Sequence, residues 1–229
     1  LRCIALDGRG GPIARLMFYA THPQTFCCDG RVSADFVGAA REAVEKETGC
    51  PLIYFTGCAG DVTVGKYNQG REVQRRELAA RLADAMRRAI AGAAVEDAPD
   101  LAWQTLPLRL EAQQDARPIT PAITDGEAYR AAIGMAFARR NRALGACALR
   151  LGHAWMLCLP GEPLLAFQRE AQRAASGRFA CAAGYGDIFP GYLCRDEDYQ
   201  LGGYEPSASN VVPGSEEKIR NAIRQLAAI

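Results

Sequence analysis

The sequence predicts an α/β fold, built as a layered sandwich of mixed β-sheets flanked by helices. Short apolar runs of strand type alternate with longer segments whose apolar residues recur at helical spacing. The chain also opens on two strand-like runs around a glycine-rich turn, which adds antiparallel pairing to the alternation. Its 229 residues are 49% hydrophobic and 23% charged, a balance typical of globular proteins.

The first half is predicted to begin with a hairpin and to continue with alternating helices and strands. Ser33 can cap the start of a helix over residues 34–48, and Gly49 can end it. An apolar run then predicts a strand that leads directly into a glycine-rich segment. The expected elements are strands 1–6 and 13–20 around a turn at 7–11, helix 34–48, strand 51–56, helix 69–94 and strand 101–110.

The second half is predicted to alternate in the same way and to include a long irregular segment. That segment, 184–214, holds four of the eight tyrosines, Tyr185, Tyr192, Tyr199 and Tyr204. Tyrosines in an irregular segment favour a pocket lining, because a buried phenol needs a hydrogen-bond partner. The other expected elements are loop 111–126, helix 127–144, strand 148–159, helix 163–176, strand 179–183 and helix 215–226.

Charge and cysteine content exclude several classes of protein. The net charge of +1 gives no reason to expect nucleic acid as a partner. No apolar stretch reaches the roughly 20 residues of a transmembrane helix. The nine cysteines are odd in number and include no CxxC pair, which favours a reduced compartment such as the cytoplasm over a disulfide framework. The chain starts directly on a strand, so we expect an N-terminal segment to precede it.

Two segments of the first half contain candidate site residues. His22, one of two histidines, follows a strand and precedes Pro23. It is either a metal ligand or a hydrogen-bonded, partly buried residue. The glycine-rich segment 57–65 joins a strand to a helix and could bind an anion, or could simply be a tight connection. It is not a P-loop, because Tyr67 stands where Ser or Thr should follow Lys66.

Glu162 and His153 are the candidates of the second half outside the tyrosine-rich segment. Glu162 lies in Pro160-Gly161-Glu162, between a strand and a helix. It could be a metal ligand, a general base or a charge that stabilises the helix N-terminus by about 0.3–1 kcal/mol. His153 lies inside the predicted strand 148–159, and we interpret it as structural.

Five motifs in order resemble the N-terminal catalytic domain of the neutral/alkaline ceramidases, closest to their short bacterial relatives. The resemblance covers nearly the whole chain and implies one ceramidase-like catalytic domain over residues 1–229. The glycine-rich stretch 55–68, Phe-Thr-Gly-Cys-Ala-Gly-Asp-Val-Thr-Val-Gly-Lys-Tyr-Asn, is the longest part of the match. The five motifs are Ala20-Thr21-His22-Pro23, Ser33-Ala34-Asp35, Gly60-Asp61-Val62-Thr63, Pro160-Gly161-Glu162 and the tyrosine segment with Gly202-Gly203-Tyr204-Glu205.

The resemblance implies a zinc-dependent hydrolase of amide (N-acyl) bonds. His22, Glu162 and Tyr192 would be ligands of one Zn²⁺, and their ligand atoms would converge. A further histidine ligand would come from a segment upstream of this chain. Tyr204 would hydrogen-bond the developing oxyanion and Thr63 would take the place of a family serine, so both would be catalytic. The partner would be a small-molecule N-acyl substrate, within lipid metabolism by analogy.

Several departures from the family pattern argue against ceramide itself as the substrate. Thr63 replaces the serine, and Val64-Gly65 replaces a Pro-Asn pair. No C-terminal β-sandwich is expected after the final predicted helix. One alternative is a catalytically inactive, metal-containing binding protein of the same fold. Another is an enzyme of a different class that uses segment 57–68, with Lys66, to bind an anionic ligand.

Overall fold

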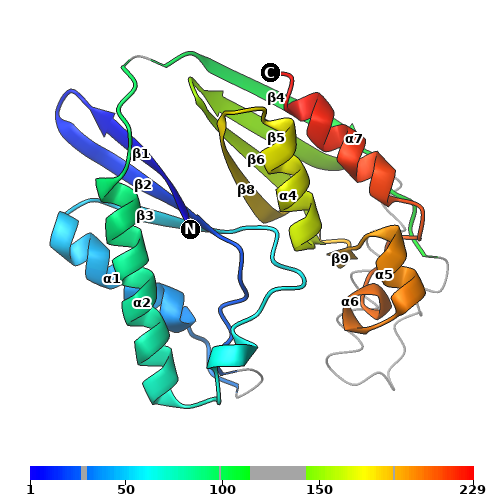
Figure 1. Cartoon of the computed structure of the whole chain (residues 1–229), viewed down its shortest axis with the longest axis horizontal. Helices are drawn as coiled ribbons and strands as arrows, with labels where there is room; N and C mark the ends of the chain where they lie inside the picture. The colour runs from blue at the N-terminus through cyan, green and yellow to red at the C-terminus, as the bar shows by residue number, and fades with distance from the viewer. Residues whose placement is uncertain (27–29, 98, 114–142, 188) are drawn as a thin grey trace. The chain divides into compact units, whose positions relative to one another are not determined.

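The computed structural model describes residues 1–26, 30–97, 99–113, 143–187 and 189–229 (Figure 1). They form two compact units. The first unit is Leu1–Gly57 with Val62–Asp97, and the second is Cys58–Asp61 with Ala98–Ile229. Each combines a mixed β-sheet with helices, which confirms the predicted α/β fold class. That the units act together as one catalytic domain stays a prediction.

The first unit is a three-stranded sheet with two helices packed on it and on each other. Strand β1 (Arg2–Gly8) pairs antiparallel with β2 (Gly11–Tyr19), and β3 (Leu52–Thr56) pairs parallel with β2. The predicted hairpin and third strand are therefore confirmed. Helices α1 (Asp35–Thr48) and α2 (Glu72–Ala91) enclose a core whose most buried large side chains are Met17, Phe36 and Met86.

Both helices of the first unit start later than the sequence predicts. Gly49, at φ +63°, ends α1 as expected, but its N-cap is Ala34. The Ser33 hydroxyl accepts the amide hydrogen of Asp35, the first helical residue, at 2.9 Å, so Ser33 lies one residue before the N-cap. Helix α2 begins at Glu72 rather than at residue 69, because Gly70 has φ +71° and cannot continue a right-handed helix. A single 3₁₀ turn, η1 (Gly65–Tyr67), precedes it.

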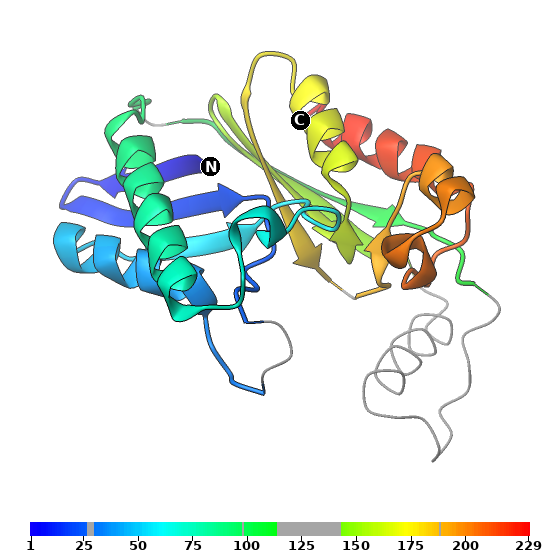
Figure 2. The ribbon, with the colours of Figure 1, turned by 60° about the horizontal axis from the view of Figure 1, so that its bottom comes forward.

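The second unit is a four-stranded sheet with two helices packed on its buried face (Figures 1 and 2). The strand order is β4 (Leu101–Leu108), β5 (Leu144–Leu151), β6 (Ala154–Pro160), β8 (Phe179–Gly186). Every second residue of β6 is buried, from Trp155 through Leu157 to Leu159, and faces the core. Phe167 of α4 (Leu165–Ala174) and Ile223 of α7 (Glu216–Leu226) are fully buried in the same core.

The prediction of one long strand over 148–159 is wrong. That stretch is an antiparallel hairpin of β5 and β6, with Gly152 and His153 in the turn. The turn consists of only Gly152 and His153, and Leu151 and Ala154 flank it directly, so hydrophobic periodicity alone does not reveal it. Leu144 begins β5 and does not end a helix. Of the predicted loop 111–126 and helix 127–144, residues 114–142 lie outside the described part of the chain.

The predicted irregular segment 184–214 contains regular structure. It includes the end of β8, strand β9 (Tyr192–Leu193), helix α5 (Asp196–Leu201) and helix α6 (Tyr204–Ser207). Across the described ranges, no helix is long and apolar enough to cross a membrane. No disulfide joins any two of the cysteines that the structure describes.

Candidate functional site

Glu162 and Tyr192 are direct neighbours in the second unit. Strand β7 (Glu162–Pro163) pairs parallel with β9, and Glu162 lies opposite Tyr192 in the register. The Glu162 amide donates to the carbonyl oxygen of Gly191 at 2.9 Å, which fixes the start of the pair. Glu162 is only 6% exposed. The structure thus brings together two expected ligands that are far apart in the sequence.

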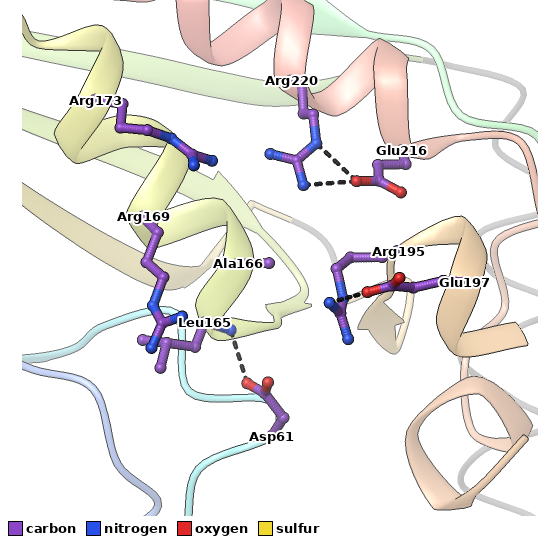
Figure 3. A pocket seen from close by; sticks show the side chains of 9 residues that line it. All are labelled: Asp61, Leu165, Ala166, Arg169, Arg173, Arg195, Glu197, Glu216 and Arg220. Carbon is purple, nitrogen blue, oxygen red and sulfur yellow. Dashed lines mark hydrogen bonds and ion pairs between the residues drawn. The ribbon is translucent and has the colours of Figure 1, made fainter. Parts of the chain in front are cut away.

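Segment 58–61, the first part of the glycine-rich stretch, supports this strand pair within the same unit. The Gly60 amide donates to the Pro163 carbonyl at 3.0 Å. A Cβ atom at Gly60 would lie 2.9 Å from the Glu162 carbonyl oxygen and 3.2 Å from Cδ1 of Tyr192, so no larger residue fits without displacement. The Asp61 carboxylate accepts the Leu165 amide hydrogen at 2.7 Å, at the start of α4 (Figure 3). Gly60 and Asp61 therefore help to position Glu162.

Tyr192 is held from its other side by the segment that follows it. The Ser209 hydroxyl donates to the Tyr192 carbonyl oxygen at 2.7 Å. Tyr199 stabilises that serine, because its phenol contacts the Ser209 hydroxyl at 3.0 Å and donates to the Val211 carbonyl at 2.8 Å. The rings of Tyr192 and Tyr204 meet edge to face, with centroids 5.8 Å apart. Tyr199 is thus a structural residue, while Tyr192 and Tyr204 lie together.

Two physical effects control the protonation of Tyr192 in the protein alone. Burial raises the pKa of its phenol above the ordinary value, and the negative charge of Glu162 raises that pKa further. The neutral phenol is therefore favoured at neutral pH. A cation bound at the oxygen would act in the opposite direction, because it stabilises the phenolate.

His22 lies in the first unit, just beyond the end of β2. Its backbone amide donates to the Val62 carbonyl, and its Nδ1 lies 2.9 Å from the same oxygen. A carbonyl only accepts, so Nδ1 must be the protonated nitrogen, and a neutral imidazole then has its lone pair on Nε2. Donation from one ring nitrogen to a carbonyl is typical of metal-binding histidines.

Thr63 forms an isolated parallel β-bridge with His22 in the first unit. Its side chain is exposed, and its hydroxyl donates to the Gln24 side-chain oxygen at 2.9 Å. The nearby ammonium of Lys66 lies over the ring of Tyr67, 5.5 Å from its centroid. The glycine-rich stretch is thus divided, with 58–61 in the second unit and 62–65 in the first.

Sequence reasoning misplaced His153 and assigned no role to Tyr185. His153 is exposed in the β5–β6 turn, and its backbone carbonyl accepts from the Phe179 amide at 3.0 Å. Tyr185 donates its phenol hydrogen to Oε1 of Glu162 at 3.1 Å. Its position in the tyrosine-rich segment was the available signal, but this contact depends on a distortion of β8 that periodicity does not reveal.

A carboxylate such as that of Glu162 and an imidazole nitrogen such as that of His22 are donor types that zinc binds. The phenol of Tyr192 is an expected ligand through the family resemblance alone. No group of three or more His, Cys, Asp or Glu side chains placed to hold a metal occurs within the described residues.

A second feature of the second unit is an open pocket of about 580 Å³ beside the start of α4 (Figure 3). Four arginines line it, Arg169, Arg173, Arg195 and Arg220, together with Asp61 and Glu216. Three of these arginines are already ion-paired: Arg195 with Asp198, Arg220 with Glu216, and Arg173 with Glu170. Charge in the pocket is therefore largely balanced, and none of the predicted site residues lines it.

Comparison with solved structures identifies a shared fold. The chain superposes on the neutral ceramidase of Pseudomonas aeruginosa with a TM-score of 0.73 and 15% sequence identity, over 98% of this chain and 45% of that one. The fold is that of the N-terminal half of a neutral ceramidase. A structure described as ceramidase complexed with C2 also has the ceramidase fold, with a TM-score of 0.72 and 14% identity, and the match covers 98% of this chain and 47% of that one.

The ceramidase fold confirms the resemblance that the motifs predicted. The chain spans about half the length of these two proteins. Its sequence matches no protein-family profile. It also matches no curated protein sequence. At this level of identity the likeness concerns the fold, so the residue roles rest on the local geometry above.

Proposed function

We propose that this chain carries the site of a zinc-dependent hydrolase that cleaves amide (N-acyl) bonds. The observation that carries the proposal is the pairing of buried Glu162 with Tyr192, supported by a glycine that leaves no room for a side chain. The ceramidase fold is consistent with it. Glu162, Tyr192 and His22 are the proposed ligands, and ceramide itself is not the substrate we propose.

The residues of this chain have separable parts in such a reaction. When bound, zinc would lower the pKa of a coordinated water towards about 7 and polarise the substrate carbonyl. Glu162 provides a buried carboxylate, and its backbone is held in the strand pair β7–β9. His22 keeps its Nδ1 proton on the Val62 carbonyl, which sets the orientation of the ring.

Tyr204 is the proposed donor to the carbonyl oxygen of the substrate. Its ring contacts that of Tyr192, so it lies next to a proposed ligand, and it is 60% exposed and accessible to a ligand. A neutral phenol stabilises negative charge as it develops on that oxygen. Thr63 would contribute only after giving up its contact with Gln24, because its single hydroxyl hydrogen is donated there.

The Thr63 contact favours a second candidate function, a metal-containing binding protein without turnover. Both candidates predict zinc binding, and only the first predicts chelator-sensitive catalysis. The test is a screen of N-acyl amides of increasing acyl length, with matched esters, before and after chelation and after zinc is restored. The longest natural form of the protein that contains this chain should be used.

Hydrolysis that is lost on chelation, restored by zinc and abolished in Glu162→Gln supports the hydrolase. Zinc binding without hydrolysis of any amide or ester supports the binding protein. Hydrolysis that persists in the chelator, or in Glu162→Gln, contradicts the proposal. His153→Ala is the matched control, because His153 lies in an exposed turn.

A further inference from the structure

Strand β8 is distorted where it approaches Glu162. It pairs parallel with β6, but the register shifts so that Cys158 lies opposite Ala183 while Pro160 lies opposite Gly186. Between these two pairs, one residue of β6, Leu159, lies opposite two residues of β8, Gly184 and Tyr185, which is a β-bulge. Bulges redirect side chains and are common beside functional sites. Tyr185 lies within this bulge.

The backbone at Tyr185 adopts a conformation that a tyrosine seldom takes. Its φ is +62°, in the left-handed region, which costs an L-residue roughly 1–2 kcal/mol. Such a conformation persists only where neighbouring contacts enforce it. The Tyr185 amide donates to the Gly161 carbonyl at 2.7 Å. Two residues later, the Asp187 carboxylate accepts the Gly145 amide hydrogen at 2.6 Å, so the turn is anchored on both sides.

The phenol of Tyr185 contacts the carboxylate of Glu162. Its phenol donates to Oε1 of Glu162 at 3.1 Å, while its ring stacks on Phe189 with centroids 6.3 Å apart. One residue thus binds the backbone of Gly161 and the side chain of Glu162. Gly161 itself has φ +65°, and a Cβ there would lie 2.8 Å from the Gly191 carbonyl oxygen, so this turn accepts only glycine.

We propose that Tyr185 is a positioning residue that sets the orientation of the Glu162 carboxylate. This inference rests on the proposed function, because it assigns Glu162 as a ligand. A carboxylate that accepts a hydrogen bond from a phenol at one oxygen has less rotational freedom in the metal-free protein. Partners that orient a ligand in this way typically change metal affinity by about 10–100-fold.

Tyr185→Phe is the test variant, because it keeps the ring, the stacking on Phe189 and the backbone contact. Tyr67→Phe is the control, since Tyr67 is an exposed phenol of the first unit. Zinc affinity is measured by competition with a chromophoric chelator, and the thermal unfolding of the metal-free proteins is measured alongside. We expect a 10–100-fold weaker affinity in Tyr185→Phe, an unchanged unfolding temperature and no effect of Tyr67→Phe.

Crystal structures of the metal-free wild type and Tyr185→Phe give a second readout that does not need zinc. The carboxylate of Glu162 should turn away or become disordered in the variant. Unchanged zinc affinity, or a carboxylate that keeps its orientation without the phenol, overturns the inference. A wild type that binds no zinc contradicts the proposed function instead, and the carboxylate orientation then decides the role of Tyr185 alone.

Discussion

Glu162 and Tyr192 lie opposite one another in a parallel pair of two-residue strands. Gly60 packs so closely against both residues that it leaves no room for a side chain of its own. A two-residue pair contributes little stability by itself. Its geometry is set by hydrogen bonds from outside the pair, from the Gly60 amide to Pro163 and from the Ser209 hydroxyl to Tyr192. The candidate site is therefore sensitive to residues that would never contact a substrate.

We expect Gly60→Ala to destabilise the second unit by about 1–3 kcal/mol, because the new methyl group meets a backbone oxygen. Gly65→Ala is the control, since its Cβ would approach only Cγ2 of Thr63, at 3.6 Å. Urea unfolding followed by tryptophan fluorescence reports on this unit, which contains both tryptophans, Trp103 and Trp155. Equal urea midpoints for the two variants would show that the nearby backbone oxygen does not restrict the residue type at position 60.

The two tyrosines should differ in what their loss removes. Tyr192→Phe should weaken zinc binding, because a proposed ligand oxygen is lost. Tyr204→Phe should leave zinc content unchanged and lower kcat by about 10²–10³, the usual loss for one oxyanion donor. Metal analysis and steady-state kinetics on the same preparations check both points. If both variants lose the metal, or neither does, the division of roles is wrong.

Ionisation of Tyr192 should depend on the metal. Burial and the charge of Glu162 raise its pKa, so the metal-free protein should keep the phenol neutral beyond the ordinary value of about 10. A bound cation favours the phenolate, so zinc added at pH 8 should release a proton and produce a tyrosinate absorption band. Tyr192→Phe should abolish that band. A band of equal size in the variant would assign the ionisation to another tyrosine.

Glu170 should stabilise the packing of α4 on α7 in a pH-dependent way. Burial alone would raise its pKa, but hydrogen bonds from Arg224 and Arg173 and the charges of Arg224 and Arg220 outweigh that effect and lower it. A lowered folded-state pKa contributes stability above the unfolded value of about 4.3, and that stability is lost as the pH falls through the folded value.

Glu170→Gln should therefore cost about 1.5–3 kcal/mol at pH 7, and the difference from wild type should shrink below about pH 4. Glu217→Gln removes an exposed partner of Arg224 and should change stability by less than about 1 kcal/mol. Urea unfolding at pH 7 and pH 3.5 measures both effects. A Glu170→Gln deficit that stays constant between those pH values would mean that the charge of Glu170 is not what stabilises the helices.

The sequence was sufficient to predict elements whose signals are local. Gly49 marks the end of α1, and the hairpin β1–β2 follows from two apolar runs around a glycine turn. The turn at Gly152 was missed because apolar residues flank it on both sides. Strand β9 was missed because two residues carry no periodicity, and its pairing with β7 is decided by tertiary contacts.

The candidate site could be predicted as a set of residue types but not as an arrangement. From sequence, segment 57–65 could be an anion site or a tight connection, whereas in the structure Gly60 and Asp61 hydrogen-bond the backbone at Pro163 and at the start of α4. The role of Tyr185 depends on a bulge and a left-handed φ, and both are properties of the folded chain. A match of sequence motifs reveals neither the bulge nor the left-handed φ.

The most direct test of the central claim is the zinc affinity of the wild type, His22→Ala and His153→Ala, measured by chelator competition. His22 and His153 are the two histidines of this chain, so the comparison separates the proposed ligand from a histidine in an exposed turn. The account predicts one zinc per molecule in the wild type and in His153→Ala, and an affinity at least about 100-fold weaker in His22→Ala. Wild-type affinity in His22→Ala, or an equal loss in both variants, would contradict it.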